Sequence, residues 1–288
     1  MNKVIVTMAI GDKYSRFYDK HCKAGFEEYA DKYGYEYICI KTPLDKTHRA
    51  SDRSPAWQKL LILSQEWSSR YDQVVWVDSD ILINNLSALD ITFNTPIEKV
   101  SAVEAYSIPT KALHDEGLLR QYSEWTRLGV PFIKNLTPAS YYENRGIFAP
   151  NLNEVLQTGV FVSSPKFHRE IFEYIYQNYE DYHGSHWNYE MPAMSYELVR
   201  NNLVNWIDPK YNFCVGNLIA IYFPEIFSTL TKRKKAINKI QNYFETGYGY
   251  KSRMQALRNI FNDGYFMHFA GCQDLMNIFS TYLQKNAS

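Results

Sequence analysis

Two acidic residues interrupt an apolar stretch of the chain, VVWVDSDILINN at residues 74–85. Because Asp78 and Asp80 are two residues apart at the expected end of a β-strand, their side chains emerge on the same side. Two carboxylates that close repel each other, and a charge away from water is costly unless it is paired or bound to a metal. A divalent cation balances both charges at once. The pair therefore favours a metal site over two alternatives, an N-cap pair and a solvated turn.

A second class of protein also places D-x-D after an apolar strand. In phosphohydrolases of the haloacid dehalogenase type, this motif usually follows the first strand, with Thr or Val two places after it. Here the motif follows the third expected strand, and Leu82 holds that place. We therefore rank this class below the metal site described above.

The composition is that of an ordinary globular protein and narrows the class of partner. The chain has 288 residues, of which 45% are hydrophobic and 22% are charged. Lys plus Arg equals Asp plus Glu, at 31 each. Nucleic-acid binders usually carry a basic excess, so the zero net charge argues against nucleic acid as a partner.

The N-terminus and the cysteines favour a cytoplasmic location. The opening MNKVIVTMAIGD is typical of a first strand and not of a signal peptide, and no segment resembles a membrane span. The cysteines show no C-x-x-C spacing, so we expect reduced thiols and no zinc site: Cys22, Cys39, Cys214 and Cys272.

Strands and helices are expected to alternate along the first part of the chain. In order, the pattern predicts a strand at 3–10, a helix at 17–33 that ends at Gly34, a strand at 35–41, a helix at 54–67 that begins at Ser54 and Pro55, and a strand at 73–83. This alternation implies an α/β fold with a parallel sheet between two layers of helices. Ligands bind at the carboxyl ends of the strands in such sheets, which is where Asp78 and Asp80 lie.

The remainder is expected to complete the same domain. The pattern predicts loops and short helices over a cleft at 104–150, a strand at 155–165, a helix at 166–179, a loop and helix at 186–203, a strand and turn at 204–213, and a helical lobe from 214. We find no repeats and no Pro-, Ser- or Gly-rich linker, so we expect one domain over residues 1–288.

Four stretches of the chain resemble one family in their content and order. Residues 54–85, SPAWQKLLILSQEWSSRYDQVVWVDSDILINN, resemble the yeast and plant family of retaining galactosyl- and xylosyltransferases, and more loosely the glycogenin-like family. These enzymes pair a W-x-K helix with a strand that ends in D-x-D. QTGVFVSSP is similar to the family's N-T-G-x-F strand, YEMPAM lies where the family has D-D-Q-x-A, and MHFAGC matches its late H-F-x-G-C.

The resemblance implies a GT-A fold, a mixed and mostly parallel sheet flanked by helices with a small C-terminal helical lobe. It implies a nucleotide-sugar donor, with a UDP-sugar favoured, and a glycan or lipid-linked glycan acceptor. Residues 1–100 would form the nucleotide-binding half, and residues 101–288 the half that closes over the metal and the acceptor. Asp78, Asp80 and His268 would hold Mn²⁺, which suits two carboxylates and an imidazole better than Mg²⁺, the alternative ion.

The resemblance also assigns roles to further residues. Glu190 would be the catalytic carboxylate beside the sugar. The residues that would contact the donor are Thr7, Met8, Ala9, Asp12, Tyr14, Lys59, Asp78, Ser79, Gln157, Thr158, Gly159 and Gly271. Taken singly, the residues around Thr7 also suit a plain strand–helix loop, and Lys59 also suits a solvated helix surface.

One position departs from the family's pattern. Met191 stands where the family has Gln, after Glu190 in place of the second Asp. Since a thioether cannot donate the hydrogen bond that an amide donates, recognition of the sugar is expected to differ here. Some of the 24 Tyr and 16 Phe residues can line a sugar site, because flat C–H faces of sugars stack on rings.

Two alternatives stay open at this point. The basic segment at 231–244 is either a solvated helix or a helix on an anionic membrane surface, near a lipid-linked acceptor. The chain as a whole is either an enzyme or a non-catalytic protein of the same fold that binds a nucleotide sugar or a glycan.

Overall fold

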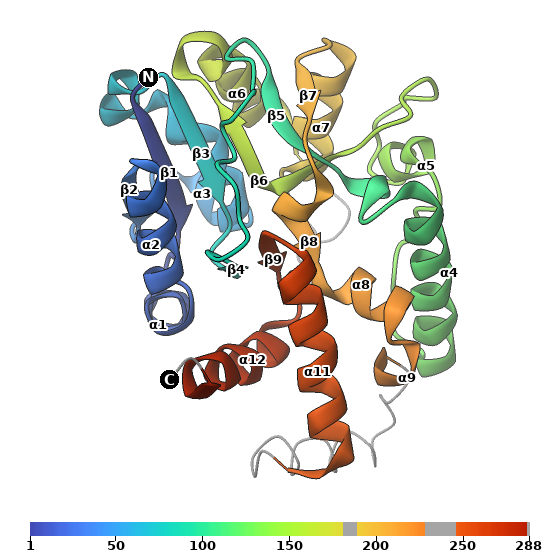
Figure 1. Cartoon of the computed structure of the whole chain (residues 1–288). Coiled ribbons are helices and arrows are strands. Elements are labelled where there is room, and N and C mark those ends of the chain that lie inside the picture. Colours follow the sequence, from blue (N-terminus) through green and yellow to red (C-terminus); the bar gives the residue numbers. More distant parts are fainter. Residues whose placement is uncertain (181–188, 228–245, 287–288) are drawn as a thin grey trace.

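A six-stranded sheet forms the centre of the molecule in the computed structural model, which describes residues 1–180, 189–227 and 246–286 (Figure 1). Its strands, in spatial order, are β2 (Glu36–Ile40), β1 (Lys3–Met8), β3 (Gln73–Val77), β6 (Leu156–Ser163), β5 (Val100–Glu104) and β7 (Val204–Trp206). All neighbours run parallel except at β6, which is antiparallel to both β3 and β5. The predicted α/β class with a mixed, mostly parallel sheet flanked by helices is confirmed.

The four central strands of the sheet are almost entirely buried and carry apolar residues on both faces. Ile5 and Val75 face one core, which is completed by α1 (Asp12–His21), α2 (Lys23–Tyr33), α11 (Gly247–Asp263) and α12 (Gln273–Asn286). Val4 and Val74 face the opposite core, which is completed by α6 (Pro165–Asn178), α7 (Met191–Arg200) and the 3₁₀ helix η1 (Pro55–Ser64). This alternation follows from the two-residue period of a strand. The carboxyl end of β3 is thereby held between two packed layers.

A second, three-stranded sheet brings the C-terminal part of the chain to the acidic pair. It consists of β4 (Ile81–Ile83), β9 (Phe266–His268) and β8 (Phe213–Cys214), in that order. Ile81 of β4 pairs with His268 of β9, which also pairs with Cys214 of β8. Since β4 begins directly after Asp80, this register places His268 beside the D-x-D turn.

Two predicted helices differ from the structure. The helix expected at 17–33 is two helices, α1 and α2, which meet at Cys22; the thiol of Cys22 donates a hydrogen bond to the carbonyl of Ser79. Gly34 ends α2 with a φ of 69°, as expected of a C-terminal glycine. The helix expected at 54–67 is two 3₁₀ segments, η1 and η2 (Glu66–Arg70), and η1 is buried around most of its circumference instead of along one stripe.

Three further differences lie in the strands and in the middle of the chain. The strand expected at 73–83 ends at Val77, turns at the acidic pair and resumes as β4. The strand β5 has no counterpart among the expected elements, whereas the strand expected at 155–165 is present as β6. The loops expected at 104–150 contain an 18-residue helix, α4 (Lys111–Leu128), whose buried residues are mostly polar or small. That composition hides the apolar period by which a helix is predicted.

The remaining elements are short or lie in the C-terminal helical lobe. They are α3 (His48–Ser51), η3 (Ala105–Ser107), α5 (Pro138–Glu143), η5 (Pro209–Asn212), α8 (Val215–Tyr222) and α9 (Pro224–Phe227). In the described ranges, no helix has both the length and the apolar character needed to cross a bilayer. The basic segment at 231–244 lies outside the described residues.

Candidate active site

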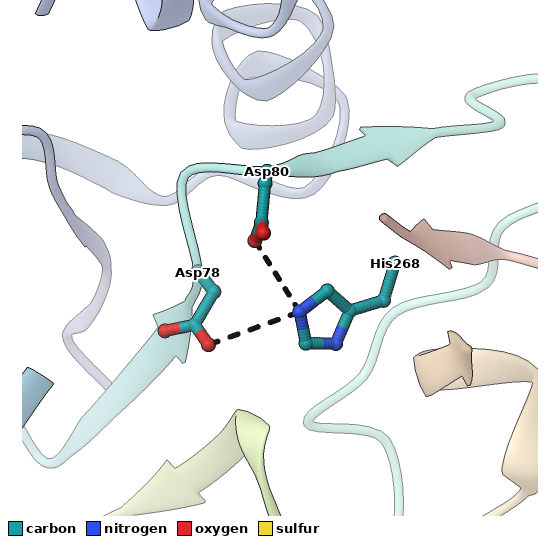
Figure 2. Close-up of side chains that lie close together, drawn as sticks. All are labelled: Asp78, Asp80 and His268. Carbon is teal, nitrogen blue, oxygen red and sulfur yellow. Dashed lines mark ion pairs between the residues drawn. The ribbon is translucent and has the colours of Figure 1, made fainter. Parts of the chain in front are cut away.

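The two acidic side chains at the end of β3 converge on one imidazole (Figure 2). Nε2 of His268 lies 3.3 Å from Oδ1 of Asp80 and 4.0 Å from Oδ2 of Asp78. One ligand atom from each of the three residues lies within 4.8 Å of the others. The three residues predicted to bind the metal are thus adjacent, although they come from two distant parts of the sequence.

The other ring nitrogen of His268 is fixed by a buried amide. Nδ1 of His268 lies 2.8 Å from Oδ1 of Asn212, at the end of η5. Because an amide oxygen only accepts hydrogen bonds, Nδ1 carries the proton, and Nε2 is left to face the carboxylates. Such contacts behind a metal-binding His set its tautomer and orientation. Asn212 was not predicted to belong to the site, because the contact joins residues 56 positions apart and Asn212 lies in no motif that we compared.

Asp78 is oriented by two donors from the sheet side. Its Oδ1 accepts hydrogen bonds from Nε1 of Trp76, at 2.7 Å, and from Nζ of Lys59, at 3.0 Å. Its backbone N–H donates to the carbonyl of Gly159 at 2.8 Å. These contacts leave Oδ2 free to face His268. Trp76 was another residue that sequence comparison alone did not place in the site.

Lys59 joins the Asp78 carboxylate to the candidate catalytic carboxylate. Its Nζ lies 3.0 Å from Oδ1 of Asp78, 2.8 Å from Oε1 of Glu190 and 3.2 Å from the carbonyl oxygen of Thr158. The three acceptors match the three N–H donors of an ammonium. Lys59 and Glu190 are each 2% exposed, and the hydroxyl of Thr158 donates to Oε1 of Glu190 at 2.8 Å. Lys59 is therefore a buried bridge in this structure and not a solvated helix lysine.

The neighbouring charges favour the ionised forms of Lys59, His268 and Asp80, whereas burial prevails at Asp78. Burial opposes the charged form of Lys59, but Asp78 and Glu190 outweigh it and raise the pKa of Lys59 above its usual value. Burial also lowers the pKa of His268, yet the Asp80 carboxylate prevails and holds that pKa well above the ordinary value. Conversely, burial raises the pKa of Asp80, but His268 outweighs it and lowers that pKa. Burial raises the pKa of Asp78, against the opposing effect of Lys59.

The three side chains fit a divalent cation. They offer carboxylate oxygens and one imidazole nitrogen, the ligand types that Mn²⁺ accepts. Asn212 and Trp76 supply the outer hydrogen bonds that metal sites require of their ligands. A bound cation would take the place of the proton that the neighbouring carboxylates favour on Nε2 of His268, because metal ligands must be deprotonated.

Gly159 provides the space that His268 occupies. A Cβ atom at this position would lie 2.5 Å from Cε1 and 2.7 Å from Nδ1 of His268, much closer than non-bonded atoms approach. Gly159 lies on β6, whose backbone is fixed by pairing with β3. The imidazole can therefore reach the carboxylates only because this residue has no side chain.

We expect Gly159→Ala to displace His268, to weaken Mn²⁺ binding at least about tenfold, and to cost roughly 1–3 kcal/mol of unfolding free energy. Electron paramagnetic resonance of free Mn²⁺ and thermal denaturation would measure the two effects. Gly216→Ala is the matched control, because its Cβ would meet Sγ of Cys272 at an ordinary 3.7 Å. Wild-type Mn²⁺ affinity in Gly159→Ala would show that binding does not depend on the observed position of His268.

Most of the residues predicted to contact a donor lie at the carboxyl ends of β1 and β3 and at the amino end of β6, which is antiparallel to β3. Thr7 is fully buried, and its Oγ1 has no hydrogen-bond partner among the described residues. Met8 is half-buried, and the N–H of Ala9 donates to Ile40. Asp12 and Tyr14 are exposed at the start of α1, so the structure does not bring them into contact with the metal-binding residues.

The remaining predicted donor residues lie on β6 and in the turns that follow β3 and β9. Ser79 occupies the turn between the two acidic residues, and Oε1 of Gln157 accepts a hydrogen bond from the N–H of Gly159 at 2.9 Å. Gly271 is exposed in the turn after β9, with a φ of 68°. Thr158 contacts Lys59 and Glu190 as described above.

Comparisons with known proteins give fold-level likeness only. No protein-family model matches the sequence, and no curated protein matches it. Among solved structures, the chain is similar to a glycosyltransferase involved in the glycosylation of the major capsid of PBCV-1. The two sequences are 17% identical, the match covers 96% of this chain and 99% of that chain, and the TM-score is 0.48. It is also similar to the galactosyltransferase LgtC in complex with donor and acceptor sugar analogs, with 11% identity, 96% and 95% covered, and a TM-score of 0.48.

A third structure, the WbbM bifunctional glycosyltransferase, shares 13% identity with a TM-score of 0.47. The match covers 99% of this chain and 51% of that one, so the present chain spans about half the length of WbbM. These similarities are too low to assign an activity, and the membership in the yeast and plant transferase family stays a prediction. The function has to be argued from the geometry of the site.

Proposed function

We propose that this chain is a metal-dependent glycosyltransferase of the GT-A type. It would move a hexosyl or pentosyl group from a nucleotide-sugar donor, with a UDP-sugar favoured, to a glycan or lipid-linked glycan, with retention at the transferred carbon. The observation that carries this proposal is that the ammonium group of Lys59 contacts two carboxylates of the site. Lys59 joins the carboxylate of Asp78, next to Asp80 and His268, to the buried carboxylate of Glu190.

The three candidate metal ligands suit departure of the nucleotide, and Glu190 suits stabilisation of the sugar. A bound Mn²⁺ ion would supply positive charge that stabilises the diphosphate of the leaving nucleotide. Asp78, Asp80 and His268 would hold the ion. Lys59 would hold Glu190 in place beside the sugar, where a carboxylate stabilises the positive charge that develops on the sugar ring in the transition state.

The proposed donor contacts follow the strand ends. The unpartnered hydroxyl of Thr7 supports a polar ligand at the end of β1, because buried hydroxyls are nearly always hydrogen-bonded. Met8 and Ala9 would lie beside the nucleotide, and Asp12 and Tyr14 beside the base. Ser79, Gln157, Thr158, Gly159 and Gly271 would border the phosphates and the sugar. In this proposal residues 1–288 form one domain, and most of the donor contacts lie in its first half and along β6.

The proposal is tested by a panel of nucleotide sugars, each incubated with the protein and Mn²⁺ and measured by release of free nucleotide. We expect slow hydrolysis of one donor, which EDTA stops and Mn²⁺ restores better than Mg²⁺. Calorimetry with the matching nucleoside diphosphate would accompany the panel. Binding without any hydrolysis would instead indicate a non-catalytic nucleotide-sugar-binding protein.

The prediction of a lipid-linked acceptor rests on a segment that lies outside the described residues. The basic and apolar residues that would face an anionic membrane lie at 231–244, outside the described ranges. Peripheral membrane contact on the cytoplasmic face therefore stays a prediction from the sequence alone.

A further inference from the structure

A small hollow adjoins the candidate active site on the side of α4 and α5. It has a volume of about 200 Å³, and three of its lining residues are direct neighbours of site residues: Gln157, Met191 and Cys214. Gln157 precedes Thr158, Met191 follows Glu190, and Cys214 pairs with His268. The lining includes none of the metal-binding residues, nor Lys59 or Glu190. The hollow therefore adjoins the proposed donor site and shares Gln157 with it.

Tyrosine side chains and apolar residues form most of its wall. Tyr106 follows β5, Tyr122 lies on α4 and Tyr141 on α5, and Leu118 of α4 also lines the hollow. Two of the phenol groups are already engaged: the hydroxyl of Tyr106 donates to the carbonyl of Asn135, and that of Tyr122 accepts from the Asn135 N–H. The wall is therefore held in place before any ligand arrives.

The third phenol is available to a ligand. Among the described residues, none forms a hydrogen bond with the hydroxyl of Tyr141, although the residue is only 7% exposed. The guanidinium of Arg145 covers its ring, with Cζ 4.1 Å from the ring centre. Burial raises the pKa of Tyr141, against the opposing effect of the Arg145 guanidinium.

We propose that this hollow holds one sugar ring of the acceptor. The inference rests on the proposed function. It assigns the acceptor, the second substrate, to the side of the site formed by α4 and α5. The aromatic walls suit the C–H faces of a sugar, while the Tyr141 hydroxyl and the Gln157 amide suit its hydroxyl groups. The volume is below the roughly 300–1,000 Å³ of sites for drug-sized ligands, so it takes a single ring and not an extended glycan.

The position of the hollow also decides between acceptor and donor. The donor's diphosphate belongs at Asp78, Asp80 and His268, and its sugar beside Glu190, so the space beyond Met191 is left for the second substrate. In the transfer, the bond from C1 of the sugar to the diphosphate oxygen breaks, and its electron pair leaves with the nucleoside diphosphate. A bond from an acceptor oxygen to C1 forms, and the acceptor's proton passes to the diphosphate.

Substitution of Leu118 tests the assignment, since a larger side chain would fill the hollow. With the donor identified by the nucleotide panel and a set of methyl hexosides and pentosides as acceptors, we expect Leu118→Trp to lower kcat/KM for transfer at least about tenfold. Hydrolysis of the donor by water should stay within about twofold of the wild type. Leu119→Trp, at the next position of α4 but 55% exposed, is the matched control and should leave both rates unchanged.

Tyr141→Phe removes only the hydroxyl, so it tests the hollow without a change of volume. We expect the KM for the glycoside to rise about three- to tenfold, as for loss of one neutral hydrogen bond, with donor hydrolysis unchanged. Equal losses of hydrolysis and transfer in both variants would place the donor's sugar in the hollow and overturn the assignment. Unchanged transfer in Leu118→Trp would also overturn it.

A binding measurement separates this inference from the proposed function. Saturation-transfer difference NMR with the same methyl glycosides, in the presence of Mn²⁺ and UDP, reports binding without catalysis. We expect a signal from at least one glycoside with the wild type and with Leu119→Trp, and none with Leu118→Trp. If no nucleotide sugar is hydrolysed, the proposed function is refuted. The NMR measurement still shows whether the hollow binds a sugar. No signal with the wild type refutes the inference.

Discussion

Asp80→Ala and His268→Ala are each expected to reduce Mn²⁺-dependent turnover to the level of the EDTA-treated wild type. Loss of an outer hydrogen bond to a metal ligand typically costs about 10- to 100-fold in metal affinity, so loss of a ligand should cost at least about 100-fold. The two residues face each other at 3.3 Å, and each substitution leaves Asp78 held by Lys59 and Trp76. We therefore expect the fold to survive both substitutions.

Titration of Mn²⁺ followed by electron paramagnetic resonance would measure the loss of affinity, and circular dichroism would verify the fold. His48→Ala is the control for the imidazole, because the side chain of His48 is 98% exposed on α3 and far from the site in sequence. Full activity of His268→Ala in EDTA would show that the three residues do not form a metal centre on which turnover depends.

The parts of the site that were predicted are those whose signal is local in the sequence. Asp78 and Asp80 lie in one short motif, and the buried strand before them makes their charge conspicuous. His268 was placed with them only through the resemblance, because nothing near it predicts that β9 pairs with β4. The register of that pairing depends on the packing of the whole C-terminal lobe.

The contacts that the sequence did not predict join residues from separate elements. Lys59 could be a surface residue on an amphipathic helix, and its burial follows only from the position of η1 between β3 and α7. Its pairing with Glu190 depends on the same arrangement. Asn212 and Gly159 contact His268 although both are distant from it in the sequence. No local motif therefore predicts that they position its side chain.

The errors in the fold have similar causes. The direction of β6 was not predicted, because composition does not distinguish an antiparallel strand from a parallel one when both faces are buried, as all but one of its residues are. The helix α4 was missed because it buries Gly117 and Gln121 in place of a stripe of large apolar residues. Since α4 forms one wall of the hollow, this error also concealed the proposed acceptor site.

Glu190→Gln keeps the size of the side chain and removes its charge, and we expect transfer to slow by roughly 10²- to 10⁴-fold, the range for loss of one such catalytic group. The amide oxygen of Gln can still accept from Lys59 and Thr158, so both of these buried donors keep their acceptor. Lys59 also keeps its ion pair with Asp78. Binding of Mn²⁺ and of the nucleotide should therefore be nearly unchanged.

Glu197→Gln is the matched control for this substitution, because Glu197 is a second buried carboxylate and lies on α7, the helix that Glu190 directly precedes. It is bound to Arg200 and Asn201 instead of to the site. We expect the control to lose stability without loss of transfer. Near-wild-type transfer by Glu190→Gln would place the catalytic carboxylate elsewhere.

The stereochemistry of the product decides what Glu190 does. If the anomeric configuration is retained, Glu190 either stabilises the positively charged sugar or attacks it as a nucleophile, and the donor's phosphate oxygen takes the acceptor proton. If it is inverted, Glu190 is the general base and must itself reach that proton. In this structure Oε1 of Glu190 is occupied by Lys59 and Thr158, which suits a fixed charge better than a group that receives a proton. We therefore expect retention, and NMR of the anomeric proton in the first product formed would measure it directly.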